Sequence, residues 1–404
     1  MAENLPFEII NEILLRLPVD ALLRCRCVSK RWHFLIDNPR FISQQLARSA
    51  RSHSNQTLFF RHKSVLRTLD LDSLSRDDSP PADASSSCAA LEEINYPLMC
   101  YSDEIKLLGS CNGLICLSNA ADDVIIWNPS LKKHRFLPYF SIEGRKSCGI
   151  SLLSVCVYGF GFVHESDDYK LLRLVEYIGQ PIESDVCLYS MRSNSWRRIQ
   201  DLPYSLIYPR KMGVFVHRAL HWVMTPELVP DSPNYIVGFD LEAENFGLIP
   251  QPDVLDKSFE IDVSDLDGYL CMVANNRNYG VDVWIMNEYG LKDSWAKLFS
   301  IPQSDVPRTS GFMWPLAYSQ GGGRILVQQD KKNLFWYDIR QKEVERIQIQ
   351  GMPSSFETQV CLRSLVPVDY RYRGSDKKKP SAKEDKERTK KRDDFLSVGF
   401  KLVL

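Results

Sequence analysis

The N-terminal stretch of the chain, residues 6–41, carries apolar side chains at the spacing of amphipathic helices. Ile9, Ile13 and Leu17 are four residues apart, so they fall on one side of a helix with 3.6 residues per turn. Pro18 follows immediately, and a proline cannot continue a helix beyond its first turn. The pattern therefore predicts an amphipathic helix that ends before Pro18.

Two shorter helical segments are predicted next. Apolar residues recur over 22–28, and Ser29 is a suitable N-cap for a third segment in which Trp32 and Ile36 share one face. Pro39 is expected to close that segment. Three short helices bury little apolar surface, and a unit of this size is marginal without a neighbour or partner. We therefore expect a small three-helix module over residues 1–45 that is completed by another surface.

From about residue 55 onward, apolar and polar residues alternate as in β-strands, with Gly, Pro, Asn and Asp at short intervals. Five segments repeat one plan, an aromatic strand, a polar turn and a second strand: 124–138, 186–203, 235–250, 281–302 and 334–351. Another strand pair precedes each of them: 108–117, 158–175, 213–224, 259–274 and 312–328. The aromatic anchors lie 62, 50, 45 and 52 residues apart: Trp127, Tyr189, Phe239, Trp284 and Trp336. Four strands repeated at this period are typical of propeller blades.

Two strand-like fragments remain, 57–71 and 359–366. A ring of blades is stable when it has no open edge, and a blade assembled from both chain ends removes it. The fold class predicted for residues 55–368 is therefore mainly β, a propeller of six blades with one composite blade. The alternative, a pair of β-sandwich domains, does not explain why one hairpin plan recurs at one period.

Three segments differ from the strand-like region in amino-acid composition. Residues 75–90 are rich in Ser, Asp and Pro and predict a mobile loop, and residues 371–394 form a charged tail without apolar periodicity. Residues 395–404 are apolar again, so we expect them to dock on the propeller or on a bound target. Two basic clusters in the tail are candidates for recognition by a nuclear import receptor: Lys377, Lys378 and Lys379, and Lys390, Lys391 and Arg392.

Composition and charge fit a folded, soluble protein. Of 404 residues 44% are hydrophobic and 25% charged, and the formal net charge of -1 gives no global reason to expect nucleic acid or a membrane surface as partner. The N-terminus lacks the pattern of a secretory signal, and the eleven cysteines include no C-x-x-C pair. We therefore expect buried free thiols and a cytoplasmic protein, which the basic clusters could also direct to the nucleus.

The sequence offers no constellation for catalysis or for a cofactor. His217 and His221 are four apart, but their context predicts strands, on which four residues span about 13 Å, too far for one zinc ion. Gly159-Phe160-Gly161 and Gly321-Gly322-Gly323 lack the remaining residues of phosphate-binding loops, and no G-x-S-x-G motif occurs. We expect no metal, no cofactor and no enzymatic activity.

The N-terminal residues closely resemble the F-box, in order and over the whole motif: Leu5-Pro6, Ile9, Ile13-Leu14, Leu17-Pro18, Leu22, Arg24-Cys25, Val28-Ser29-Lys30, Trp32, Leu35-Ile36, Pro39 and Phe41. The resemblance implies a module that binds the adaptor Skp1 and, through it, a cullin that carries the ubiquitin-conjugating machinery. The residues that it assigns to adaptor binding are Leu5, Pro6, Ile9, Ile13, Leu17, Pro18, Leu22, Cys25, Val28, Trp32, Leu35 and Ile36. The alternative is a helical cap that only packs on the propeller.

The remainder resembles the kelch-like F-box-associated interaction domain of plant proteins, through the stretches 108–116 and 126–130. Most blades lack the paired glycines of regular kelch repeats. The C-terminal stretch 392–404 is similar to the end of the F-box proteins called constitutive expresser of PR genes. The resemblance implies a substrate receptor of an SCF ubiquitin ligase that promotes turnover of a target, with NLR immune receptors as the implied target class and restraint of plant defence as the outcome. A propeller scaffold or a propeller enzyme without a ubiquitin-ligase role is the alternative.

Overall fold

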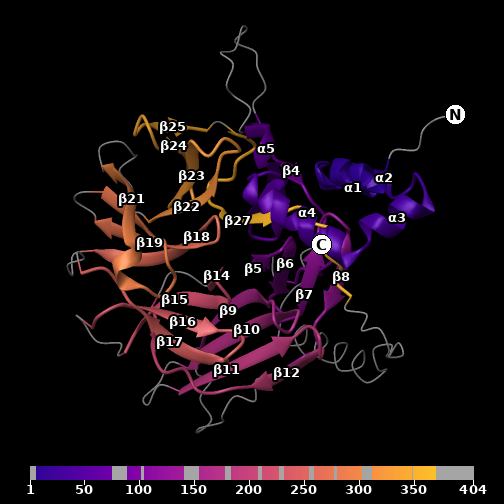
Figure 1. The fold of residues 1–404 in the computed structure, drawn as a ribbon. Coiled ribbons are helices and arrows are strands. Elements are labelled where there is room, and N and C mark those ends of the chain that lie inside the picture. The colour runs from indigo at the N-terminus through magenta and orange to yellow at the C-terminus, as the bar shows by residue number, and fades with distance from the viewer. Residues whose placement is uncertain are drawn as a thin grey trace, which may run out of the picture.

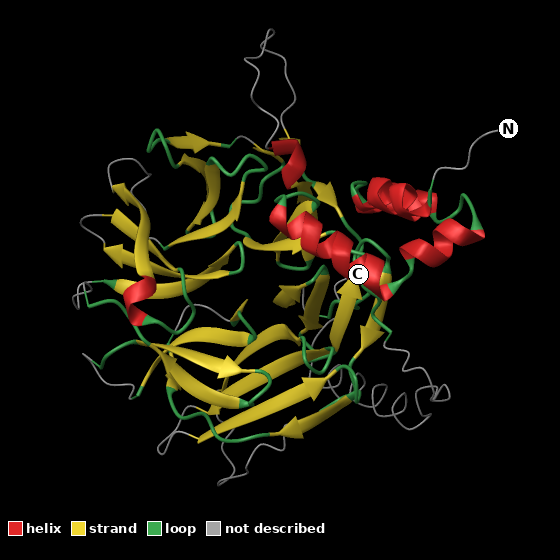
Figure 2. Ribbon diagram, viewed as in Figure 1, coloured by secondary structure: helices red, strands yellow, loops and turns green. Residues whose placement is uncertain are grey.

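The computed structural model has two parts, a cluster of N-terminal helices and a ring of β-sheets around a central channel (Figures 1 and 2). It describes residues 6–74, 89–101, 104–140, 154–177, 183–207, 212–226, 232–253, 259–276, 280–302, 312–347 and 349–369. The predicted loop up to residue 88, the charged tail, its basic clusters and the apolar end at 395–404 lie outside these residues, as does Leu5. The last two residues of the predicted loop, Ala89 and Ala90, form the short strand β3.

Four helices precede the ring: α1 (Phe7–Leu15), α2 (Val19–Cys25), α3 (Lys30–Ile36) and α4 (Pro39–Arg51). Ser29 caps α3 as predicted, because its hydroxyl accepts a hydrogen bond from the Trp32 N–H (3.1 Å). The third helix ends before Pro39 as expected, but Pro39 also begins α4, a fourth helix that the three-helix prediction lacked. Proline is favoured in the first helical turn, and the Asn38 side chain caps the helix by accepting from the Arg40 N–H (2.9 Å).

The ring consists of six antiparallel blades, which confirms the predicted propeller. The first blade contains β27 (Glu357–Leu362), β1 (Gln56–His62), β2 (Val65–Asp70) and β4 (Glu92–Glu93). It is the composite blade expected from the two fragments, because β27 from the C-terminal end pairs with β1 from the N-terminal end. A turn of helix, α5 (Leu71–Leu74), follows β2, and β3 (Ala89–Ala90) pairs in parallel with β26 (Ile349–Gln350).

The other five blades follow in chain order. The second has β5 (Ile105–Cys111), β6 (Leu114–Asn119), β7 (Val124–Asn128) and β8 (Lys133–Phe136). The third has β9 (Ser154–Val163), β10 (Asp168–Tyr177), β11 (Glu183–Ser190) and β12 (Ser195–Arg198). The fourth has β13 (Ser205–Leu206), β14 (Val214–Val216), β15 (Ala219–Thr225), β16 (Tyr235–Asp240) and β17 (Asn245–Ile249). The fifth has β18 (Glu260–Leu266), β19 (Tyr269–Asn276), β20 (Gly280–Met286) and β21 (Trp295–Pro302), with the short helix η1 (Lys292–Ser294) before β21. The sixth has β22 (Met313–Tyr318), β23 (Arg324–Gln329), β24 (Asn333–Asp338) and β25 (Val344–Arg346).

The strands run back and forth between two faces of the ring. The chain enters β1 after Asn55 and leaves β27 at Arg363, whose backbone N–H donates to the Asn55 carbonyl (2.7 Å). Because α4 ends just before this point, we call this side the helix face and the opposite side the far face (Figure 1). The first strand of each blade lines the channel and ends at the helix face, so it begins at the far face. Segments near the start of β18 and β22 therefore meet at the far face.

Candidate adaptor and target interfaces

The N-terminal helical module has its own apolar core. Leu14, Val19, Leu22, Ile36 and Phe41 are buried in it, with Leu35 at its edge. Three of the predicted adaptor contacts, Leu22, Leu35 and Ile36, are thus buried inside the module in this structure. The reason is that each faces the neighbouring helices, so its side chain contributes to folding rather than to a surface.

A second set of apolar side chains is exposed on α1, on α3 and in the turn between α2 and α3. Ile9 and Ile13 are each 47% exposed, Val28 is 64% exposed and Phe34 is 76% exposed. The sequence assigned the first three to adaptor binding but missed Phe34, as well as the exposed Phe7 of α1. Exposed large apolar side chains gathered on one small module mark an interaction surface. Of the remaining predicted contacts, Leu17, Cys25 and Trp32 are half-buried and pack against the core of the module, whereas Pro6 and Pro18 are exposed.

The module is fixed to the propeller by packing and by charge. Ile42 on α4 packs against the core of the module and also against the core of the second and third blades. Leu365, from the segment after β27, is buried in the module's core. Arg363 pairs with Asp20 of α2 (3.0 Å) and with Asp70 at the end of β2 (2.6 Å). The C-terminal segment therefore joins the adaptor module to the ring.

The end of α4 lies over the central channel, which has a volume of about 410 Å³. His53 Nδ1 lies 3.4 Å from a carboxylate oxygen of Asp267, and the His53 ring lies 5.4 Å from that of Tyr318. Asp265 also lines the channel, and its carboxylate accepts a hydrogen bond from the Gly268 N–H (2.9 Å). The helix face of the channel is thus partly covered by the module.

The two stretches that resemble family signatures hold the closing segment of the ring. The buried Asn128 side chain donates from Nδ2 to the backbone carbonyls of Ser364 (3.1 Å) and Val366 (2.7 Å). Its oxygen accepts from the Leu131 N–H (3.1 Å). Gly113 lies against Ser364 as well. These motifs are therefore structural, because they hold the segment that follows β27, the strand that closes the composite blade.

The candidate zinc pair has a structural role instead. His221 is buried, with Nδ1 3.0 Å from the Val214 carbonyl and Nε2 2.7 Å from the Tyr289 hydroxyl. Burial lowers the pKa of its imidazole to about 4, and His217 stacks on the same tyrosine ring. In the part of the chain that the structure describes, no group of three or more His, Cys, Asp or Glu side chains is placed to hold a metal ion.

The cysteines within the described ranges are all free. Cys111 and Cys116 lie on the paired strands β5 and β6 and are buried. Burial raises the pKa of both thiols, so they stay protonated at neutral pH.

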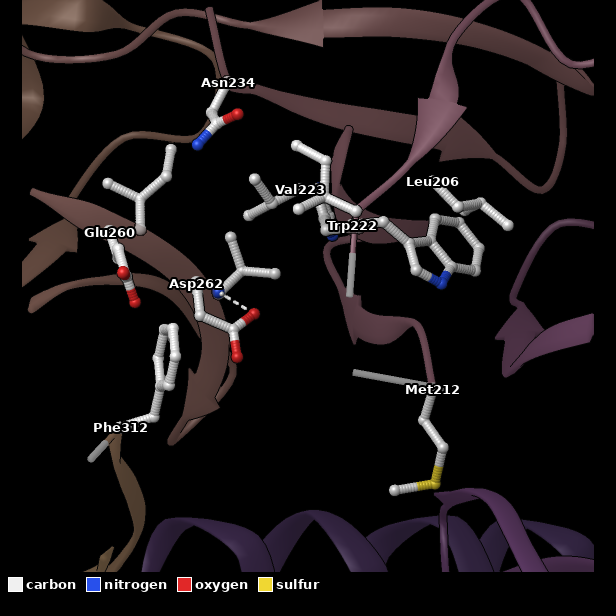
Figure 3. Close-up of a pocket in the computed structure, with 12 residues that line it drawn as sticks. Leu206, Met212, Trp222, Val223, Asn234, Glu260, Asp262 and Phe312 are labelled. Atoms are coloured by element: carbon white, nitrogen blue, oxygen red, sulfur yellow. Dashed lines mark hydrogen bonds between the residues drawn. The ribbon is translucent and has the colours of Figure 1, made fainter. Parts of the chain in front are cut away.

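The far face carries a pocket of about 330 Å³ between the fourth and fifth blades (Figure 3). Its walls come from the start of β18, from β15 and from the chain before β14. Asp262, Trp222 and Phe312 line it, with Asn234 and Glu260 at other points of the wall. This pocket was not predicted, since its residues are far apart in the sequence.

A helical module with an exposed apolar surface, fixed to one face of a six-bladed propeller, defines the class of F-box proteins in which the ring serves as interaction domain. The F-box domain family matches residues 3–44, and the F-box associated beta propeller domain family matches residues 62–364. The chain belongs to the family of F-box proteins with an F-box associated β-propeller domain.

Curated relatives agree over the whole length. The chain is 34% identical to F-box protein CPR1 of Arabidopsis thaliana, over 99% of this chain and 100% of that protein. It is 31% identical to F-box protein At4g22390 of the same plant, over 99% of each chain. F-box/kelch-repeat protein At3g23880, also from Arabidopsis thaliana, is 29% identical over 79% of this chain and 84% of that protein.

Membership of this family supports the role of substrate receptor in an SCF-type ubiquitin ligase, a non-catalytic adaptor role. The F-box implies a Skp1-type partner, and the propeller implies a target protein. None of the helices that the structure describes is long and apolar enough to span a membrane.

Proposed function

We propose that the chain binds a Skp1-type adaptor through the exposed apolar side chains of its F-box and holds a target protein on the propeller for ubiquitination and proteasomal degradation. The observation that carries this proposal is the exposure of Ile9, Ile13, Val28 and Phe34 on a module whose core is already filled. A helical cap that only packed on the propeller would have no need for these exposed side chains.

The contacts between module and ring support the second half of the proposal. An adaptor bound to the F-box and a target bound to the ring would be held at a fixed separation by Ile42, Leu365 and Arg363. A fixed separation favours transfer of ubiquitin to lysines of the target that lie within reach.

The target class rests on the sequence. The similarity of residues 392–404 to the constitutive expresser of PR genes proteins favours NLR immune receptors as targets and a role in restraining defence. The basic clusters at 377–379 and 390–392 favour activity in the nucleus as well as in the cytoplasm.

The test is capture of a purified Skp1-type adaptor by the full chain. Ile13→Asp combined with Val28→Asp places two charges on the exposed surface without touching the core of the module, so capture should fall at least tenfold. Leu248→Asp is the matched control, because Leu248 is 51% exposed but lies on β17 of the propeller. Wild-type capture by the double variant, or equal loss in the control, would contradict the proposal.

A second experiment uses a fragment of residues 55–404, which lacks the four N-terminal helices. This fragment should bind the target, compete with the full chain and slow turnover of the target, provided that its circular dichroism shows a folded ring. Turnover as fast as with the full chain would show that residues 1–45 do not recruit the ligase.

A further inference from the structure

The outermost strand of each blade has an open edge, on which backbone N–H and C=O groups have no partner strand within the blade. In the part of the ring that the structure describes, these strands are β4, β8, β12, β17, β21 and β25. Charged side chains normally keep such an edge from pairing with another chain. All of these strands except β17 carry at least one charged residue. β17 carries none, since its sequence is Asn-Phe-Gly-Leu-Ile.

The hydrogen-bond pattern shows which backbone groups of β17 point away from its blade. The Leu241 N–H donates to the Arg218 carbonyl (3.1 Å), so residues 241, 239 and 237 direct their backbone groups toward β15. The residues between them on β16 bond to their partners on β17, which are residues 245, 247 and 249. The N–H and C=O groups of Phe246 and Leu248 therefore point outward from the blade.

The outward edge of β17 is regular and accessible. Leu248 is 51% exposed, and a Cβ atom added at Gly247 would meet nothing within 4 Å. The ladder between β16 and β17 runs without a bulge, whereas the ladder between β20 and β21 shifts register at Trp284. A bulge protects an edge strand, and a glycine within a strand often marks the close approach of another backbone. The edge of β17 is therefore suited to pairing with a further strand.

We propose that β17 pairs with β17 of a second copy of this chain, in an antiparallel register centred on Gly247. In this register Phe246 of one copy lies opposite Leu248 of the other, and the outward backbone groups of each such pair form two hydrogen bonds. Both side chains are apolar and lie on one face of the shared sheet, where directly opposite residues contact each other. The same contact is repeated across the two-fold axis, so the pairing closes at a dimer.

The charges that flank β17 are compatible with this register. Glu244, the charged residue just before the strand, would lie opposite Pro250 of the second copy, and its carboxylate is already paired with Lys170 (2.9 Å) and with Arg197. The pairing is short, because the Glu244 N–H donates to the Asp240 carbonyl (2.8 Å) and Pro250 has no N–H. Four intermolecular hydrogen bonds and a small buried area predict a weak dimer, with a dissociation constant in the micromolar range.

The position of β17 leaves the F-box accessible in such a dimer. Figure 1 shows β17 on the outer side of the ring, away from the helices α1, α2 and α3. A dimer through this edge would therefore carry two F-boxes and two rings, which raises the effective affinity for a target that itself has two binding sites. The inference goes beyond the proposed function, since self-pairing of β17 requires neither adaptor nor target.

Sedimentation velocity of the full chain, with a Skp1-type adaptor added to cover the exposed F-box side chains, measures the self-association. The average mass should rise from one copy toward two as the protein concentration increases to about 500 µM, with no larger species. Leu248→Pro removes an outward N–H but no bond to β16, so it should weaken association at least tenfold. Leu248→Lys places a charge on the edge and should do the same. Leu291→Lys is the matched control, because Leu291 is 47% exposed but lies before η1 and not on an edge strand.

Cysteine cross-linking of the chain alone tests the register. The two copies of Gly247 would form a non-hydrogen-bonded pair with Cα atoms about 4.5 Å apart, which is within the range of a disulfide. Gly247→Cys should therefore give a reducible dimer when oxidised glutathione accepts the two electrons from the thiols. Asn245→Cys is the control, because its two copies would lie about 13 Å apart. The native cysteines are the same in both variants.

Three results would overturn the inference. A chain that stays monomeric up to about 500 µM does not pair with itself, and the edge of β17 would then be left to a strand of another protein. Unchanged association in Leu248→Lys, with circular dichroism showing a folded ring, would place the contact elsewhere; this variant keeps the test valid if Leu248→Pro does not fold. Equal cross-linking of Gly247→Cys and Asn245→Cys would exclude the register.

Discussion

A single methyl group added at Gly113 tests how the ring is closed. Gly113 follows Asn112 in the hairpin turn between β5 and β6, and its φ is +81°. A Cβ atom there would lie 2.2 Å from the Ser364 hydroxyl oxygen and 2.6 Å from the Leu362 carbonyl oxygen. The second contact is with backbone, so it can be relieved only if the end of β27 moves away from the second blade.

Gly268 provides a matched control. It follows Asp267 in the equivalent turn of the fifth blade, its φ is +79°, and an added Cβ would meet nothing within 4 Å. Alanine in the left-handed conformation costs about 1–2 kcal/mol at either position. Overpacking costs a further amount of about 1–3 kcal/mol at Gly113 alone. We therefore expect Gly113→Ala to lower the free energy of unfolding by about 2 kcal/mol more than Gly268→Ala does.

Urea unfolding of the full chain, followed by tryptophan fluorescence, measures this difference. Limited proteolysis should also show earlier cleavage next to β27 in Gly113→Ala, because the composite blade opens first. Adding Ser364→Gly should restore part of the lost stability, since it removes the hydroxyl but not the Leu362 carbonyl. If the two alanine variants are equally stable, the closing segment does not press on this turn and the reasoning is refuted.

Two other predictions concern charge. A double-mutant cycle with Asp20→Ala and Arg363→Ala, measured by urea unfolding, should give a coupling free energy of about 0.2–1 kcal/mol between the two side chains. The value is small because Asp20 is 61% exposed and water screens its ion pair with Arg363. A coupling free energy well above this range would show that the pair is a main link between module and ring. The pKa of His221 falls from 6.5 in the unfolded chain to about 4 in the folded chain. Between pH 6.5 and pH 4, therefore, only the unfolded state binds the proton. The free energy of unfolding should therefore fall as pH drops from 6.5 to 4, with a contribution of about 1.4 kcal/mol per pH unit that His221→Gln removes. An unchanged pH slope in unfolding experiments on that variant would contradict the assignment.

Local patterns in the sequence determine the elements of this protein. The fourfold spacing of Ile9, Ile13 and Leu17 predicts α1, and the recurring aromatic hairpins predict the blades, because both depend on which way neighbouring side chains point along one element. The composite blade could also be predicted, since a ring with two spare fragments has one way to remove its edges.

Only the tertiary structure decides which apolar side chains of the F-box are core and which are surface. Ile36 is buried and Val28 is exposed, although both belong to the same motif. Part of the reason is long-range: Leu365, more than 300 residues later in the chain, fills the module's core, and no local pattern encodes that contact. The far-face pocket depends in the same way on two adjacent blades. Its acidic and aromatic residues, Asp262 and Trp222 among them, are unremarkable in the sequence until packing brings them together.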